Sequence, residues 1–156
     1  MKFTEIRHGS PEYLLECALR HAVLRAPLGL NLADEDLTAE IHHRHFGLFL
    51  SDDSLIACAS AVPTSAGEMK IRQMAVRVDH QGKGHGRALM EQLMQSLADS
   101  GIHRFTLHAR ANVMGFYQSL GFTPSGPTFE EIGIPHVKMT RTTEAFPPRT
   151  PRYGLQ

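Results

Sequence analysis

The chain has 156 residues, of which 42% are hydrophobic and 21% charged, and this balance is ordinary for a globular protein with a single core. Its formal net charge is zero, so no overall field attracts nucleic acid or an anionic membrane. No apolar run approaches the roughly 20 residues that span a bilayer, and the first residues lack the apolar core of a signal peptide. Cys17 and Cys58 suit small buried side chains in a reducing compartment. We therefore expect a cytoplasmic protein that binds neither nucleic acid nor membrane.

The first expected helix has clear start and stop signals. Ser10 is a favourable N-cap, and Pro11 fits the first helical position, where its missing N–H costs nothing. Pro27 and Gly29 end the helical pattern. Between these signals, apolar residues recur at helical spacing and indicate an amphipathic helix: Leu14, Leu15, Ala18, Leu19, Ala22 and Val23.

The other expected elements are short strands and helices. Alternating or continuous apolar runs predict strands at residues 2–7, 46–50, 55–62, 69–78, 105–109, 128–132 and 137–140, and helical patterns cover residues 37–41, 89–98 and 113–120. Their order is that of an α/β protein with a mixed sheet. We expect a single domain over residues 1–145, followed by an extended, proline-containing tail over residues 146–156.

A glycine-rich turn joins the strand at residues 69–78 to the helix at residues 89–98. Its three glycines stand at every second position, so the backbone can approach a ligand and adopt positive φ. The unpaired N–H groups of the helix N-terminus favour an anion. The spacing is neither the dinucleotide fingerprint nor a P-loop, and a plain tight turn is the alternative. The turn predicts a phosphate cradle made by Gln81, Gly82, Lys83, Gly84, His85, Gly86 and Arg87.

Two motifs resemble those of one protein family. The pattern Gln-x-x-Gly-x-Gly at residues 81–86 resembles the acyl-CoA pyrophosphate motif of the GNAT superfamily of N-acetyltransferases. The segment Gly-Phe-Tyr-Gln-Ser-Leu-Gly-Phe at residues 115–122 is similar to the family's helix–turn–strand motif, in which a tyrosine precedes Gly-Phe. With the strand before the turn, the resemblance covers residues 68–122. Gly-Ile-Pro-His at residues 133–136, together with Leu19-Arg20, resembles the ElaA-like branch of the superfamily.

The resemblance implies a GNAT-like fold in which the strands at residues 69–78 and 105–109 run parallel and splay apart. The pantetheine arm of acetyl-CoA, the expected co-substrate, would enter the splay, with its pyrophosphate at the glycine-rich turn. In similar proteins the first of these strands bulges. The backbone N–H groups of Met74, Ala75 and Val76 would there bind the pantetheine amides and stabilise the oxyanion of the reacting thioester. Gln81 would cap the turn or touch a phosphate.

The resemblance also implies that Tyr117 is a general acid that protonates the departing CoA thiolate. Its helical phase would equally let it fill the core. Phe116 is expected at the cofactor pocket, chiefly through packing. Arg110 stands where many relatives have an asparagine, and Asn112 follows two residues later. Either residue could contact CoA, because an arginine can reach a phosphate, while Asn112 also suits the N-cap of the next helix.

The reaction also needs a base, since an amine with a pKa of about 10.4 is mostly charged near pH 7. In similar folds the last strand pair borders the acceptor cleft, and here it holds Glu130, Glu131 and His136. We take Glu131 and His136 as catalytic candidates, the alternatives being a solvated carboxylate and a structural histidine. His43 and His45 would share a strand face, but no clear partner completes a metal site, so we expect none.

The sequence thus predicts an N-acetyltransferase that moves an acetyl group from acetyl-CoA to a primary amine, on a small molecule or a peptide. Direct attack in a ternary complex is favoured, because neither cysteine falls in a nucleophile motif. One alternative is a CoA-binding sensor of the same fold that lacks catalysis. Another is a related acyltransferase that uses a different acyl group or acceptor. A homodimer is compatible with all three.

Overall fold

The computed structural model describes residues 1–143, so the expected tail at residues 146–156 lies outside the described part of the chain. The strands there are β1 (Lys2–Ile6), β2 (Arg44–Phe49), β3 (Leu55–Ser65), β4 (Glu68–Val76), β5 (Arg104–Arg110), β6 (Thr123–Pro124), β7 (Phe129–Glu131) and β8 (Ile134–Thr142). The α-helices are α1 (Pro11–Arg20), α2 (His85–Asp99) and α3 (Met114–Ser119). The shorter helical turns are η1 (His21–Arg25), η2 (Ala26–Leu28), η3 (Leu32–Asp34), η4 (Thr38–His42), η5 (Val78–His80) and η6 (Ala111–Val113). None of the described helices is long and apolar enough to cross a membrane.

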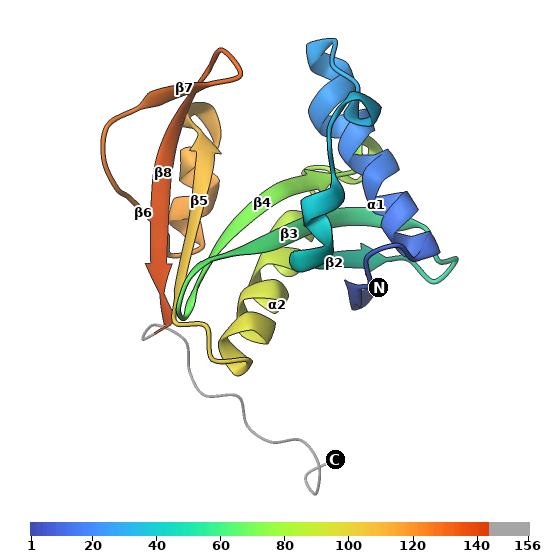
Figure 1. Ribbon diagram of the computed structural model, residues 1–156, viewed down its shortest axis with the longest axis horizontal. Helices are drawn as coiled ribbons and strands as arrows, with labels where there is room; N and C mark the ends of the chain where they lie inside the picture. Colours follow the sequence, from blue (N-terminus) through green and yellow to red (C-terminus); the bar gives the residue numbers. More distant parts are fainter. Residues whose placement is uncertain (144–156) are drawn as a thin grey trace, which may run out of the picture.

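The strands of residues 1–143 form one mixed, eight-stranded sheet. Its order is β1-β2-β3-β4-β5-β8-β6, with β7 paired to β8, and only β4 and β5 run parallel. Their pairing covers residues 68–70 and 104–106, and beyond it the two strands diverge (Figure 1). The expected splay of two parallel central strands is therefore confirmed. Past this point, the facing edges of β4 and β5 pair with no strand in the described part of the chain.

The two longer helices cover opposite faces of the sheet. Met74 and Val76 of β4 pack with the α2 core, whereas Ala75 between them packs with α1. The buried face of α2 follows its apolar spacing: Leu89, Met90, Leu93, Met94 and Leu97 are all 0% exposed. Each buried side chain of this kind stabilises the fold by about 1.5–3 kcal/mol. Because five of them point one way, helix α2 is anchored firmly and its N-terminus has a defined position.

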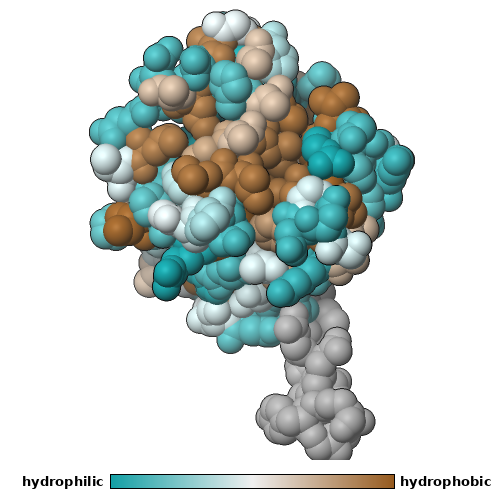
Figure 2. All heavy atoms as spheres, turned by 90° about the vertical axis from the view of Figure 1, so that its right-hand side faces the viewer, coloured by the Kyte–Doolittle hydropathy of each residue, from teal (hydrophilic) through white to brown (hydrophobic). Residues whose placement is uncertain are grey.

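Helix α1 buries Leu19, as its apolar spacing predicted, but most of its buried face is different from the predicted one. It begins after Ser10, whose side chain accepts from a backbone N–H as expected of an N-cap. Leu14 and Leu15, however, are 69% and 44% exposed. Figure 2 shows apolar surface gathered on this side of the molecule. The buried positions instead include Glu16 and Arg20, both 0% exposed.

A set of buried charges explains this orientation, and we call Tyr13, Glu16, Arg20, Glu40 and His45 the buried network. Arg20 donates to the two carboxylate oxygens of Glu40 at 2.8 and 2.7 Å and to Glu16 at 3.3 Å. His45 Nδ1 lies 2.9 Å from Glu16, and its Nε2 lies 2.9 Å from the Glu40 carbonyl. Both partners accept, so both ring nitrogens carry protons. Burial opposes this charge, but Glu16 outweighs it and raises the pKa of His45. Tyr13 donates its hydroxyl to Glu40 at 2.6 Å.

Two carboxylates of the buried network lie beside His45 in the folded protein. No clear carboxylate partner for a histidine site was evident from the sequence, and the structure places Glu16 of α1 and Glu40 of η4 beside His45. The potential ligand atoms of Glu16, Glu40 and His45 lie within 4.8 Å of one another. The positive charges of Arg20 and His45 already balance both carboxylates, so we interpret the cluster as an ion-pair network.

The remaining expected elements are present with shifted ends, and the short turns η3, η5 and η6 were not expected. Further differences concern the end of the first helix, β6 and Asn112. The helix that begins at α1 changes to the π-helical η1 and the 3₁₀ turn η2 before Gly29 ends it at a φ of +72°. The short strand β6 carries no sequence pattern that predicted it. Asn112 lies inside η6, and its side chain caps neither η6 nor α3, so its expected N-cap role is wrong.

Candidate active site

The glycine-rich turn leads directly into α2, and its backbone explains all three glycines. Gly82 and Gly84 have φ values of +75° and +83°, a region that favours glycine. A Cβ added at Gly86 would lie 2.7 Å from Cε of Met74, so this glycine lets α2 approach β4 closely. Gly84 is the N-cap of α2 and no side chain caps the helix. The first N–H groups of α2 are therefore open to an anion.

A pocket of about 900 Å³ lies beside this turn, and we call it the turn pocket. It is bounded by the turn itself, the end of β4, and α3. The residues expected to bind the cofactor that line it are Met74, Ala75, Val76, Gln81, Gly82, Gly84, His85, Gly86, Arg87, Arg110, Phe116 and Tyr117. The lining is completed by Val23, Leu24, His80, Val113 and Ser119. Two other expected residues, Lys83 and Asn112, do not line the pocket and are exposed.

Two side chains of the turn are engaged within the protein. Gln81 donates its amide to the Val76 carbonyl at 2.9 Å, so it caps the end of β4. Arg87 donates to the Ser119 carbonyl at the end of α3, at 3.2 and 3.3 Å. The backbone of the turn is thus the part that remains available to a ligand.

Strand β4 bulges next to the turn pocket. Cys58 pairs with Ala75 and Ser60 pairs with Arg72, so two residues of β4 face a single residue of β3. Gln73 sits in the bulge with a φ of +56°, unusual for a residue that is not glycine. Its side chain accepts from Arg25 at 3.1 Å, which ties the bulge to η1. The structure thus has the expected bulge, one residue before Met74.

Tyr117 lies on α3 with its ring partly buried. The ring makes edge contacts with Phe116 and Phe122, at centroid distances of 5.0 and 6.1 Å. Its hydroxyl is 3.8 Å from the sulfur of Met74, so the hydroxyl reaches the bulged end of β4. Burial raises the pKa of Tyr117 to about 12. The side chain is therefore a protonated phenol near neutral pH.

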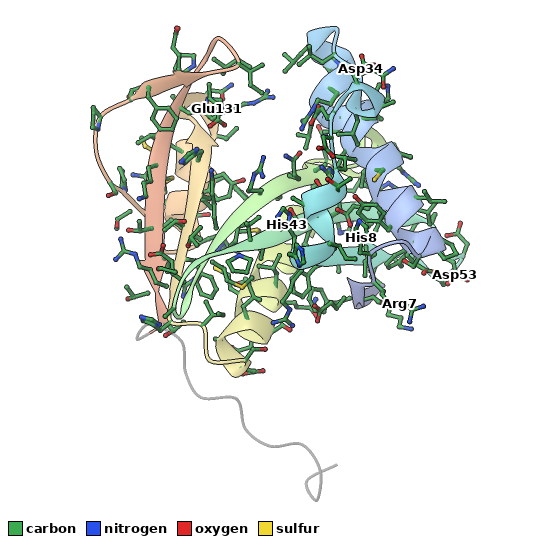
Figure 3. All side chains as sticks on the ribbon, in the orientation of Figure 1. Arg7, His8, Asp34, His43, Asp53 and Glu131 are labelled. Carbon is green, nitrogen blue, oxygen red and sulfur yellow. The ribbon has the colours of Figure 1, made fainter. Side chains whose placement is uncertain are left out.

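A second pocket, of about 440 Å³, lies on the face of the sheet opposite α2, and we call it the sheet pocket. Its walls come from β4, β5, the β7–β8 hairpin and the segment from η1 to Glu35. Figure 3 shows Glu131 of the hairpin and Asp34 of the facing segment on opposite sides of this end of the molecule. Both catalytic candidates named from the sequence, Glu131 and His136, line the sheet pocket.

The sheet pocket brings together four polar side chains, which we call the pocket cluster: Lys70, His108, Glu131 and His136. Glu131 Oε1 lies 2.9 Å from His108 Nδ1, and Lys70 Nζ lies 3.3 Å from the same nitrogen. His136 Nδ1 lies 2.7 Å from the Ile134 carbonyl, and its Nε2 lies 3.8 Å from Glu131. Burial opposes the charge of Glu131, but the hydrogen bond with His108 outweighs it and lowers the pKa of Glu131.

His108 is the site residue that sequence reasoning missed. Its position on β5 is two residues before Arg110, and the pairing of β5 with β8 sets Arg110 opposite His136. The alternation of β5 therefore held a signal, since residues two apart share a face of a strand. Its partner Glu131 comes from β7, which only the tertiary structure places beside it. Of Arg110 and Asn112, the two residues that could contact CoA, Arg110 lines both pockets and Asn112 lines neither.

Comparison with known proteins identifies the class. The family model described as Acetyltransferase (GNAT) domain matches residues 26–143. The chain therefore belongs to the GNAT acetyltransferase family, as the glycine-rich turn and the Tyr117 motif predicted.

Individual relatives agree with this assignment. The chain is 32% identical to the protein YyaT of Bacillus subtilis over 72 residues, which cover 46% of this chain and about half, 49%, of that relative. The crystal structure of Escherichia coli ElaA superposes with a TM-score of 0.76 at 24% identity, covering 90% of this chain and 99% of ElaA. An aminoglycoside 6′-N-acetyltransferase in complex with coenzyme A superposes with a TM-score of 0.74 at 16% identity, covering 97% and 100%. The two structures show that the fold is shared.

Proposed function

We propose that this protein is an N-acetyltransferase that transfers an acetyl group from acetyl-CoA to a primary amine by direct attack in a ternary complex. The observation that carries the proposal is the junction of the two pockets, because both are lined by Leu24, Met74, Arg110 and Tyr117. A thioester held in the turn pocket and an amine held in the sheet pocket would meet beside the hydroxyl of Tyr117. Membership of the GNAT family supports acyl-CoA as the donor.

The turn pocket suits acetyl-CoA in charge and in shape. The uncapped N-terminus of α2 and the glycine backbone would bind the pyrophosphate. The edge of β4 at Met74, Ala75 and Val76, which has left its pairing with β5, would offer backbone groups to the pantetheine arm. Arg110 at the junction would add a positive charge near the phosphates or the thioester. The related fold that was solved with coenzyme A supports a ligand of this size.

We place the general base at His108. Glu131 holds the Nδ1 proton of this ring, so the lone pair on Nε2 is available to accept a proton from the amine. The lowered pKa of Glu131 makes its carboxylate a weak base, so its proposed role is to orient and polarise His108. His136 is buried and directs Nδ1 to the Ile134 carbonyl, so we propose that it positions Glu131 and the hairpin.

The surroundings of the pocket cluster also favour the reactive form of the acceptor. Burial and the charge of Arg72 lower the pKa of Lys70, which faces the same pocket. An acceptor ammonium in that position would experience the same effects, and more of it would be the neutral amine. A neutral amine is the species that can attack a thioester.

The transfer needs no covalent acyl-enzyme. The amine nitrogen forms the new C–N bond as the C–S bond breaks, His108 takes the amine proton, and Tyr117 gives its proton to the departing sulfur. Neither Cys17 nor Cys58 lines either pocket, and Cys58 is 0% exposed. The two cysteines are therefore not placed to act as nucleophiles.

The substitution Tyr117→Phe tests the proposal. It keeps the ring and removes the proposed acid, so turnover should fall by about 10²–10⁴-fold while acetyl-CoA affinity changes little. CoA release measured by thiol detection would give turnover, and calorimetry would give affinity. Tyr13→Phe is the matched control, because it removes a hydroxyl from the buried network and should lower stability rather than turnover. Undiminished turnover in a folded Tyr117→Phe variant would contradict the assignment. Acetyl-CoA binding without CoA release for any acceptor would favour the sensor alternative.

A further inference from the structure

The alternation of side chains along the strands places several basic residues on the face of the sheet opposite α2. Met69 and Ile71 of β4 pack into the core with α2, so the residues between and after them face the other way. The register of β5 with β8 extends the same face across both strands. The basic residues on it are Lys70 and Arg72 of β4, His108 and Arg110 of β5, and His136 and Lys138 of β8.

The sheet pocket on this face has more cations than carboxylates. Apart from its histidines, its ionisable side chains with ordinary charge at neutral pH are Arg25, Lys70, Arg72, Arg110, Glu35 and Glu131. The two carboxylates are already engaged, Glu35 by Arg25 at 3.2 Å and Glu131 by His108 at 2.9 Å. Neither is left to balance the other positive charges of the pocket.

Lys70 and Arg72 are neighbouring cations on β4 without a full partner, and Arg110 at the junction with the turn pocket also makes no side-chain hydrogen bond or ion pair in the described part of the chain. Within residues 1–143 the side chain of Arg72 makes no hydrogen bond and no ion pair. The polar contact of Lys70 is with His108 Nδ1, the same nitrogen that Glu131 uses. Both side chains nevertheless face the sheet pocket. Two neighbouring cations that lack an internal counter-charge favour an anion from solution.

We propose that the acceptor is a small amine that also carries an anionic group, a carboxylate or a phosphate, and that Lys70 and Arg72 bind this group. This inference rests on the proposed acetyltransferase function. The amine lies near His108 and Tyr117, where the pockets meet, and the anionic group lies further along β4. A volume of about 440 Å³ admits a small molecule. Polyamines and other polycations are disfavoured, because they would add positive charge to a pocket that already has an excess.

The test uses acceptors that differ mainly in charge. The pairs are β-alanine with β-alaninamide and with 1,3-diaminopropane, and O-phosphoethanolamine with ethanolamine. CoA release at a fixed acetyl-CoA concentration would give kcat/KM for each acceptor. The results with β-alanine and with O-phosphoethanolamine show whether the site prefers a carboxylate or a phosphate. At least one anionic amine should exceed its matched partners by about tenfold or more, the size expected for a charged hydrogen bond.

The variant Arg72→Gln checks that this preference comes from β4. It should lower kcat/KM for the preferred anionic amine by about tenfold to a hundredfold, mainly through KM, since the contact exists before and during the reaction. The loss should be several times smaller for the matched amine without the anionic group, because that amine makes no contact of this kind. Lys138→Gln is the control, because Lys138 shares the sheet face but lines neither pocket. Arg72 is exposed, so the variant should melt like the parent protein.

Calorimetry separates this inference from the proposed function. Binding of β-alanine or O-phosphoethanolamine that is lost in Arg72→Gln would support the anion site even if no CoA is released. Turnover that is equal or higher with β-alaninamide, ethanolamine or 1,3-diaminopropane would overturn the inference and leave the acetyltransferase proposal standing. The absence of both anion binding and a charge preference would also overturn it.

Discussion

The buried network and the pocket cluster lie on the same side of the sheet and are built from similar residues, but their charges are balanced differently. In the buried network, Arg20 and His45 meet Glu16 and Glu40, and the hydrogen-bonding partners are internal. In the pocket cluster, one carboxylate is shared by two histidines, and the neighbouring cations lack counter-charges. The first arrangement is balanced in charge and holds α1 to η4 and β2, with Glu16 Oε1 and Arg20 Nε as its buried atoms that make no hydrogen bond within residues 1–143. The second has unused hydrogen-bonding capacity that faces a pocket.

The difference separates charges that hold the fold together from charges that are available to a ligand. A buried ion pair is costly to desolvate, and it survives when every member is paired. Breaking it should therefore damage folding. A cluster that faces a pocket and has unused hydrogen-bonding groups can lose a member without unfolding the protein. The loss should then appear in activity. Variants that remove one member of each cluster test this division.

The pocket cluster should control turnover without controlling stability. His108→Asn should lower kcat by about 10²–10⁴-fold, equivalent to about 3–5 kcal/mol in the barrier, because it removes the proposed base. Its melting temperature should stay close to that of the parent protein. The exposed His42, which lines neither pocket, gives the matched control His42→Asn. CoA release and thermal melts would be measured on both variants. A His108→Asn protein that turns over like the parent would remove His108 from the mechanism.

The buried network should control stability. Arg20→Met leaves two buried carboxylates without their cation, and the free energy of unfolding should fall by about 3–5 kcal/mol. Urea denaturation would measure it, with Arg20→Lys as a milder variant should the first not fold. Arg44→Met is the control, because Arg44 binds Glu5 through two hydrogen bonds of 2.7 Å at the surface and should lose only about 0–1 kcal/mol. Similar losses for the two arginines would break the comparison.

The turn pocket should bind acetyl-CoA through backbone groups that one added charge can block. At 100 times its dissociation constant, acetyl-CoA should stabilise the parent protein by about 2.7 kcal/mol. Gly84→Asp should abolish this gain by placing a negative charge at the phosphate position. Gly84→Asn is nearly the same size, tolerates the φ of +83° similarly and adds no charge, so it should keep most of the gain. Equal thermal shifts for Asp and Asn would contradict the phosphate assignment.

The smallest effect is a dependence of stability on pH that comes from the buried network. The pKa of His45 is raised in the folded protein, so its contribution is fully present below the unfolded value of about 6.5 and is lost as the pH rises through the folded value. Arg20 and Tyr13 lower the pKa of Glu40 to about 2 against the cost of burial, so its contribution is present above 4.5 and is lost as the pH falls. Melting temperatures between pH 6 and 9 should decline for the parent and less for His45→Gln. His42→Gln should follow the parent, and a parallel decline in His45→Gln would exclude His45 as the cause.

Local features of the fold and site were predictable from the sequence. The glycine-rich turn, the helix α2 after it and its five buried apolar residues depend on neighbours within a few positions, where spacing and positive φ carry the information. The position of Tyr117 at the turn pocket was predictable because its motif is also local. Much of the lining of the turn pocket comes from these local segments, although Lys83 and Asn112 were expected there and do not line it.

Two other features depended on contacts between distant segments. Apolar spacing could not reveal that α1 buries Glu16 and Arg20, since Glu40 and His45 make that burial tolerable from 20 or more residues away. His108 likewise meets Glu131 only because β8 pairs with both β5 and β7.

Sequence alone was therefore enough for most of the elements, the family and the glycine-rich turn, because each depends on short-range spacing. Which charges are balanced internally, and which face a pocket without a counter-charge, depends on the tertiary structure. The physical reason is that the energy of a charge depends on its partners and its burial, and both are set by strand register and helix packing.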